Sequence, residues 1–140
     1  MPALARAMTV LLPLLLVACA QVGSRPDAGL TGTVAAPPGT TLPASVSLRV
    51  TLLDVGVDLG AEPIAEVTMD NPRLPVNFAI GYDPRAIDDT HRYLLQAQLT
   101  GDGRLLLLTT DEYAVITQGH PRHADIVLAA PGEGVVTAPQ

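Results

Sequence analysis

Residues 76–82 read VNFAIGY, and this stretch decides the fold class. Every second side chain is large and apolar or aromatic, while the three positions between them hold Asn, Ala and Gly. A period of two is typical of a β-strand with one buried face. The same alternation runs through residues 46–52 and 93–99, so the sequence predicts several strands of this kind.

Shorter strand-length segments lie between these three, and none keeps helical spacing over three turns. Prolines stand at their borders, where a missing backbone donor does little harm. We therefore expect an all-β fold, an antiparallel sandwich or a small barrel, and take the antiparallel β-sandwich of about seven or eight short strands as the specific prediction. The shorter candidate strands are residues 30–34, 64–69, 105–108, 114–117 and 125–129.

Local turn chemistry connects the predicted strands. Residues 100–104 read TGDGR, and a short Asp-Gly loop between two apolar runs predicts a β-hairpin. The leucine run at 105–108 has no alternation, so we expect a central strand covered on both faces, or a strand with one face hidden by a partner. Asp83 and Pro84 fit the cap and the first position of a single helical turn.

Composition limits the core and the partners. Hydrophobic residues make up 48% of the chain but aromatic residues only 3%, so the core must be aliphatic. The formal net charge of -6 repels phosphate backbones, so no nucleic-acid partner is expected. The sequence has no phosphate-binding glycine loop and no Gly-x-Ser-x-Gly motif, so it predicts neither a cofactor nor an enzyme.

Residues 1–18 have the layout of a secretory signal peptide, with one positive charge, an apolar run and then small residues. The apolar run is far shorter than the roughly 20 residues that a transmembrane helix needs. Residues 19–28 are then a lipidated cysteine and a flexible tether, residues 29–130 the β-sandwich domain, and residues 131–140 a disordered Gly/Pro-rich tail.

Cys19 is the only cysteine, and it directly follows the apolar run. The segment LVAC at residues 16–19 resembles the lipobox of bacterial lipoproteins, whose cysteine is diacylated on sulfur, becomes the new N-terminus and is usually acylated again on its amine. Two or more acyl chains attach a protein stably to a membrane. Ala20 stands where an aspartate would indicate the inner membrane, which favours the outer membrane of a Gram-negative bacterium. The alternative is a buried or redox cysteine at the end of a signal peptide.

A series of short motifs resembles the YbaY-type lipoprotein family, which is grouped with the YscW-type pilotins of type III secretion. The resemblance covers nearly all of residues 29–129 and implies a β-sandwich held by lipid at the outer membrane. It also implies a partner, because pilotins bind the C-terminal tail of a secretin subunit and help it reach the outer membrane. The motifs are VTLLDV at 50–55, PVNF at 75–78, GYDP at 81–84, DTHRY at 89–93, GRL at 103–105, and Thr110-Asp111 with Tyr113.

The loop between two predicted strands holds the tentative binding residues, which are Tyr82, Asp83, His91, Arg92 and Tyr93. Its tyrosines could rim a shallow binding surface. The structural alternative, which we favour, is that they plug the ends of the sandwich with their hydroxyls reaching water.

His91 lies beside Asp88 and Asp89 and could be imagined as an acid/base site. The favoured alternative is structural, with Arg92 or Arg85 pairing with one of these aspartates across the loop.

A second group, His120, His123 and Asp125, could bind a metal if its side chains converged. A proline at position 121 disrupts helical spacing, so we favour a solvated turn before the last strand and predict no metal site.

The sequence therefore predicts a non-enzymatic lipoprotein, attached by its N-terminal lipid to the outer membrane and facing the periplasm. Its expected work is pilotin-like binding or chaperoning of an envelope or secretion-system protein, with an open sheet edge as the means of binding. The alternative function is a glycan- or lipid-binding module in which residues 105–108 line an apolar cleft.

Overall fold

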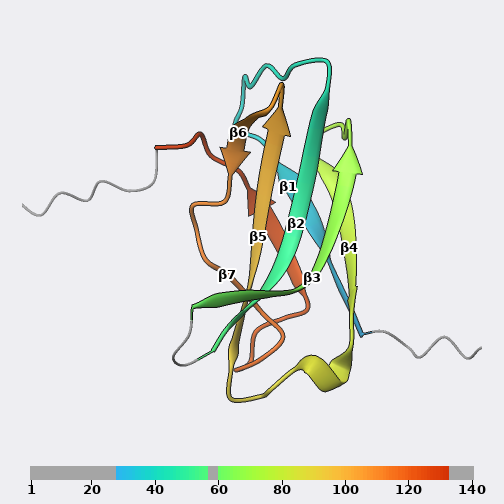
Figure 1. Cartoon of the computed structure of the whole chain (residues 1–140), viewed down its shortest axis with the longest axis vertical. Helices are drawn as coiled ribbons and strands as arrows, with labels where there is room; N and C mark the ends of the chain where they lie inside the picture. Colours follow the sequence, from blue (N-terminus) through green and yellow to red (C-terminus); the bar gives the residue numbers. More distant parts are fainter. Residues whose placement is uncertain (1–27, 57–59, 133–140) are drawn as a thin grey trace, which may run out of the picture.

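The computed structural model describes residues 28–56 and 60–132, and these residues form two β-sheets packed face to face (Figure 1). The predicted all-β sandwich is confirmed, and one pair of strands, β1 with β8, is parallel rather than antiparallel. The smaller sheet has the order β4 (Val76–Tyr82), β1 (Ala28–Ala35) and β8 (His123–Val127). The larger sheet has the order β3 (Ala61–Asp70), β2 (Val46–Val55), β5 (Arg92–Gly101) and β6 (Arg104–Leu108), with β7 (Tyr113–Val115) also paired to β5.

The predicted signal peptide and Cys19 lie outside the described residues, as do all of the tether except its last residue, Ala28, and residues 133–140 of the predicted tail. No helix in the part that is described has the length and apolar character needed to cross a membrane.

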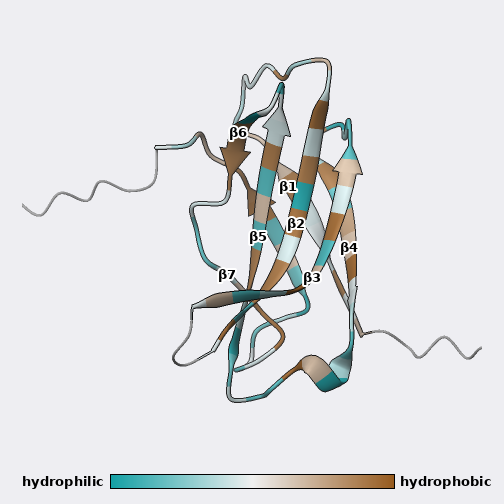
Figure 2. Cartoon of the chain, viewed as in Figure 1, coloured by the Kyte–Doolittle hydropathy of each residue, from teal (hydrophilic) through white to brown (hydrophobic). Residues whose placement is uncertain are grey.

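The core lies between the two sheets and is mostly aliphatic, as predicted. Inward-facing side chains of β2 and β5 are almost completely buried, and Figure 2 shows them as hydrophobic bands that alternate with polar ones along both strands. Each buried Leu, Ile or Val contributes about 1.5–3 kcal/mol relative to an exposed side chain. The core residues of these two strands are Val46, Leu48, Val50, Leu52, Tyr93, Leu95, Ala97 and Leu99.

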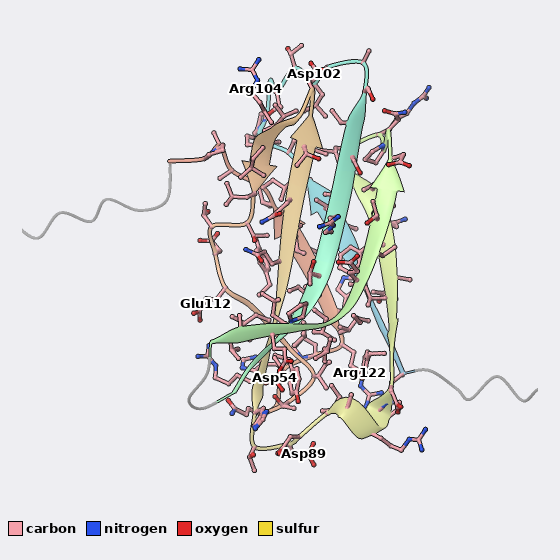
Figure 3. The ribbon with its side chains drawn as sticks, viewed as in Figure 1. Asp54, Asp89, Asp102, Arg104, Glu112 and Arg122 are labelled. Atoms are coloured by element: carbon pink, nitrogen blue, oxygen red, sulfur yellow. The ribbon has the colours of Figure 1, made fainter. Side chains whose placement is uncertain are left out.

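The β5–β6 hairpin confirms the turn prediction. Its two loop residues, Asp102 and Gly103, have φ angles of 51° and 72°. Positive φ at both positions defines a type I′ turn, whose twist matches that of the flanking strands. Asp102 and Arg104 lie at the tip of this hairpin, at the end of the sandwich opposite Asp54 and Asp89 (Figure 3).

The prediction that the leucine run forms a central strand is wrong, because β6 lies at the edge of the larger sheet. Leu107 is buried in the core and Leu106 packs against it half-buried, whereas Leu105 is 40% exposed. Leu108 is half-buried, and its backbone N–H and C=O bond Ala129, which follows β8. The run lacks simple alternation because the β5–β6 register shifts there: Leu105 lies opposite Thr100 and Leu107 opposite Leu99, with Leu106 as the extra residue between them. That a partner hides one face of the run stays a prediction.

The single helical turn is confirmed as a 3₁₀ turn over Pro84–Ala86. Asp83 caps it by accepting a hydrogen bond from the Arg85 backbone N–H at 2.9 Å, and Pro84 occupies the start, where no N–H is needed. This turn opens the loop that carries the chain from β4 in one sheet to β5 in the other.

Candidate functional site

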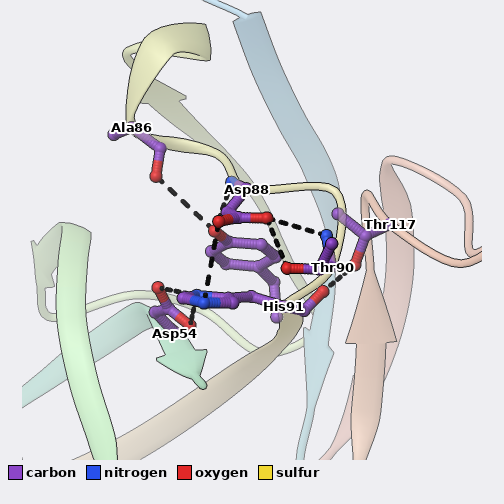
Figure 4. Close-up of polar contacts among 7 residues, drawn as sticks. Asp54, Ala86, Asp88, Thr90, His91 and Thr117 are labelled. Carbon is purple, nitrogen blue, oxygen red and sulfur yellow. Dashed lines mark hydrogen bonds and ion pairs between the residues drawn. The ribbon is translucent and has the colours of Figure 1, made fainter. Parts of the chain in front are cut away.

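The loop over residues 83–91 crosses one end of the sandwich, and the candidate site is built on it. Tyr93, the second residue of β5, supports the loop from inside and is only 1% exposed. Its hydroxyl accepts a hydrogen bond from the Asp88 N–H at 2.8 Å and donates to the Ala86 carbonyl at 3.5 Å (Figure 4). Burial raises the pKa of the Tyr93 phenol above its usual value, so the hydroxyl keeps its proton and can hold both bonds.

His91 connects the loop to the larger sheet. Its Nδ1 lies 2.9 Å and 3.0 Å from the two carboxylate oxygens of Asp54, at the end of β2 (Figure 4). Its Nε2 lies 3.8 Å from the Asp88 carboxylate. The hydrogen bond to Asp54 raises the pKa of His91, partial desolvation opposes that shift, and the charges of both aspartates add to it.

Two threonines complete the hydrogen-bond network of the loop. The Asp88 carboxylate accepts hydrogen bonds from the Thr90 backbone N–H at 2.9 Å and from its hydroxyl at 2.6 Å. These bonds lower the pKa of Asp88, the side-chain bond having the larger effect. Thr117, buried between β7 and β8, donates its hydroxyl to the His91 carbonyl at 2.7 Å. The loop is therefore bonded to β2, to β5 and to the β7–β8 connection.

The structure brings together only part of the predicted binding set. His91 and Tyr93 belong to the network just described, and Asp83 caps the 3₁₀ turn at the start of the loop. Tyr82 is 5% exposed, and its hydroxyl has no hydrogen-bond partner among the described residues. Arg92 points away from the network to Glu112, 2.9 Å distant.

Two structural expectations for the loop are wrong. Neither arginine pairs with the adjacent aspartates, because Arg92 bonds Glu112 and Arg85 bonds Asp83 at 3.3 Å. The tyrosine hydroxyls do not all reach water either, since the Tyr93 hydroxyl is bonded to the backbone inside the loop. The Tyr113 hydroxyl, by contrast, is at the surface, where it accepts a hydrogen bond from the Val127 N–H at 2.9 Å.

Sequence reasoning missed Asp54 and Thr117, which are distant from His91 along the chain. Asp54 is brought to His91 by the antiparallel pairing of β2 with β5, which places Asp54 opposite Tyr93, and the local strand pattern does not encode this pairing. Thr117 had no comparable signal, since it lies in an irregular segment.

These contacts hold the loop against the larger sheet, and we call the residues that make them, Asp54, Asp88, Thr90, His91, Tyr93 and Thr117, the clamp. Within the described residues, the ring nitrogens of His91 contact only the carboxylates of Asp54 and Asp88, so no hydroxyl or thiol is placed for activation by this histidine. A similar pairing occurs on β8, where His123 Nε2 lies 3.1 Å from Asp125. Across residues 28–56 and 60–132, no group of three or more His, Cys, Asp or Glu side chains is arranged to hold a metal ion.

Two surface hollows lie at the end of the sandwich far from this clamp. One, of about 420 Å³, has polar walls that include Ser47, Asp70 and Asn71. The other, of about 300 Å³, lies between the β1–β2 and β3–β4 connections and is lined by prolines, Leu42 and Leu74. Neither is lined by the leucines of β6, which the predicted apolar cleft would require.

A comparison with protein families gives a match over residues 25–128 to the family described as type III secretion system lipoprotein chaperone (YscW). The chain belongs to the YscW family. The matched span contains all eight strands of the sandwich and the clamp, so the membership covers the whole described domain. A comparison with curated proteins gave no match.

A solved structure supports the same placement within the YscW family. It is that of an alternative pilotin from the type II secretion system of Vibrio cholerae, with a TM-score of 0.69 and 31% sequence identity. The match covers 74% of this chain and 96% of that chain. The predicted kinship with pilotins is thus confirmed for fold and family.

Proposed function

We propose that this protein is a pilotin-like lipoprotein that binds a protein component of a secretion system or of the cell envelope without catalysing a reaction. The observation that carries the proposal is the match to the YscW family over the whole sandwich, together with the likeness to a pilotin chain of which 96% is covered. The clamp supports it, because both ring nitrogens of His91 lie against carboxylates, those of Asp54 and Asp88. Within the family, we place the chain with the YbaY-type members.

The proposed anchor is Cys19, acylated after removal of residues 1–18, with the sandwich on a short tether facing the periplasm from the outer membrane. Lipid attachment explains why one cysteine stands directly after a short apolar run. We expect Cys19→Ser to leave the protein uncleaved or soluble. Membrane fractionation and mass spectrometry of the mature N-terminus measure both outcomes, and a bare thiol at Cys19 in the wild-type protein would refute the anchor.

The proposed binding surface lies near the clamp and consists of the accessible residues of the predicted binding set. Asp83 and Arg92 are exposed and His91 is half-buried, so these three can contact a partner. Tyr82 and Tyr93 are buried and would act only by holding the loop in place.

The test is site-specific photocrosslinking in intact cells, with a photoreactive residue placed at Asp83 or Arg92 and, as the control, at Thr68 on the outer face of the larger sheet. A crosslink to one defined envelope protein from the loop positions supports the proposal. If neither loop position nor any other surface position yields a defined protein adduct, the binding function is wrong.

A further inference from the structure

The two sheets differ in width, and the difference is concentrated on one side. Across the sandwich the larger sheet has β3, β2, β5 and then β6 or β7, whereas the smaller sheet has only β4, β1 and β8. On the β8 side the sheets are joined, because Leu108 and Ala129 exchange two backbone hydrogen bonds of 2.9 Å and 2.8 Å. The missing width therefore lies on the other side, where β3 and β4 form the two edges (Figure 1).

Burial of inward-facing residues confirms where coverage is missing. Met69, Val67 and Ala65 of β3 lie opposite Leu48, Val50 and Leu52 of β2 and share their inward face. The three β2 residues are 0% exposed, but the three β3 residues are only half-buried. On the far side of the same sheet, Leu107 and Val115 are buried. The apolar face of β3 thus lacks an opposing strand.

The edges formed by β3, β8 and β6 are protected against pairing with another chain. β3 carries Pro63, a register shift beside it, and three acidic residues. β8 is short, and the N–H of Val127 is taken by the Tyr113 hydroxyl. β6 is also short, and its last residue is bonded to Ala129. Proline, bulges, charges and short length are the usual means of preventing edge-to-edge association.

The edge formed by β4 has none of these features. Its seven residues contain no proline and no charge, and they pair in regular register with β1. Among the described residues, no hydrogen bond is made by the backbone groups of β4 that face away from β1. An edge that is regular and unprotected is a template for an added strand.

We propose that the β4 edge accepts an extended segment of a partner polypeptide as a fourth strand of the smaller sheet. The segment would have apolar residues at every second position, because its inward side chains would cover Val67 and Met69 of β3. It would have basic flanks, because β3 carries three carboxylates, and among the described residues only that of Glu66 has an ion-pair partner, Arg49 at 3.9 Å. The net charge of the whole chain, -6, favours a basic segment as well.

A second copy of this chain fits the edge less well. Two β4 strands paired about a two-fold axis would bring two β3 edges together, and each carries Glu62, Glu66 and Asp70. Repulsion among these carboxylates disfavours the dimer and favours a cationic partner.

The inference rests on the proposed binding function and specifies its partner chemistry. The probe is a synthetic peptide of alternating valine and threonine, as long as β4, with lysines at both ends, added to the mature full-length protein in detergent. We expect binding, measured by fluorescence anisotropy, and slower hydrogen exchange in residues 76–82. An otherwise identical peptide with aspartates at both ends should bind about tenfold more weakly.

Two further peptides test strand addition itself. One peptide is N-methylated at its odd-numbered amides and the other at its even-numbered amides. Because successive N–H groups of an extended peptide point to opposite edges, each peptide keeps its N–H donors on one edge only. A strand added to β4 uses one edge, so one of the two should lose about a hundredfold in affinity while the other keeps most of it. Equal binding of both peptides, or exchange protection outside β4, would overturn the proposal.

Matched variants locate the edge. Ala79→Lys places a charge on an exposed position of β4, and Val127→Lys places the same charge on an exposed position of the protected β8. Peptide binding should weaken for Ala79→Lys but not for Val127→Lys. If Ala79→Lys does not fold, Asn77→Lys takes its place. Self-association of the protein that excludes the peptide would identify a second copy as the occupant and refute the proposal. A defined crosslinked partner that is retained equally by Ala79→Lys would refute the edge while leaving the binding function intact.

Discussion

Removing the hydroxyl should destabilise the protein at one buried tyrosine, Tyr93, but not at another, Tyr82. Tyr93→Phe deletes an acceptor 2.8 Å from the Asp88 N–H and a donor to the Ala86 carbonyl, while the ring keeps its packing. Tyr82→Phe deletes a buried hydroxyl that has no hydrogen-bond partner among the described residues. The two residues are 1% and 5% exposed, so the comparison isolates the hydrogen bonds.

The magnitude follows from the polar groups left behind. The loss of a good hydrogen bond and of a partner for a part-buried N–H lowers the free energy of unfolding of Tyr93→Phe by about 1–2 kcal/mol. Removal of an unpaired buried hydroxyl leaves the stability of Tyr82→Phe unchanged or raises it by about 1 kcal/mol. With a urea m-value of about 1.5 kcal/mol per M, the midpoint of Tyr93→Phe should fall by about 1 M.

Equilibrium urea unfolding, followed by far-ultraviolet circular dichroism, measures both variants. The m-values should match that of the wild-type protein, so that a shifted midpoint reports a change in stability. An unchanged midpoint for Tyr93→Phe would show that its hydroxyl does not hold the loop. An equal loss in Tyr82→Phe would show that its hydroxyl has a partner and that the contrast drawn from burial is wrong.

Three further changes test other parts of the structure. The hydrogen bond to Asp54 raises the pKa of His91 above 6.5. The stabilisation from protonated His91 is therefore fully present below pH 6.5 and is lost as the pH rises through the raised pKa. In unfolding measured at a series of pH values across this range, His91→Gln should abolish the loss of stability. Gly32→Ala would drive a methyl group into the carbonyl oxygen of Ala124 on the neighbouring strand, so a loss of about 2 kcal/mol or more is expected in thermal unfolding, and a neutral result would contradict the close approach of β1 and β8. Gly103→Ala, at a φ of 72° in the hairpin turn with open space around it, should cost only about 1 kcal/mol, and a larger loss would mean that the turn contributes more than its backbone conformation.

The strands could be predicted from the sequence because each long strand alternates with one face in the core. Residues 76–82 were predicted with the bounds that β4 has in the structure. The Asp102-Gly103 turn was equally readable, since a type I′ turn requires positive φ at two successive positions and few residue pairs supply it. These features depend on local sequence alone.

What could not be predicted depends on contacts between distant segments. The leucine run of β6 reads as a strand buried on both faces, but its place at an edge is set by pairing with β5 and by the bridge to Ala129. The parallel pairing of β1 with β8 joins residues 92 positions apart, such as Thr31 and His123, and no local pattern encodes it. The bond between His91 and Asp54 likewise spans 37 positions.

The clamp and the open edge are connected through β4. This strand has a hydrogen-bonded neighbour on one side only, so its position over the larger sheet depends on β1 and on the connections at its two ends. At one end the chain passes from Tyr82 through the 3₁₀ turn into the loop that His91 and Tyr93 bind to β2 and β5. A loop held at three points fixes the end of β4 before any partner arrives, which reduces the entropy lost when a strand is added. The loop residues therefore need not touch a partner to affect its binding. Tyr93→Phe should weaken binding of the valine–threonine peptide, even though the Tyr93 hydroxyl faces the interior.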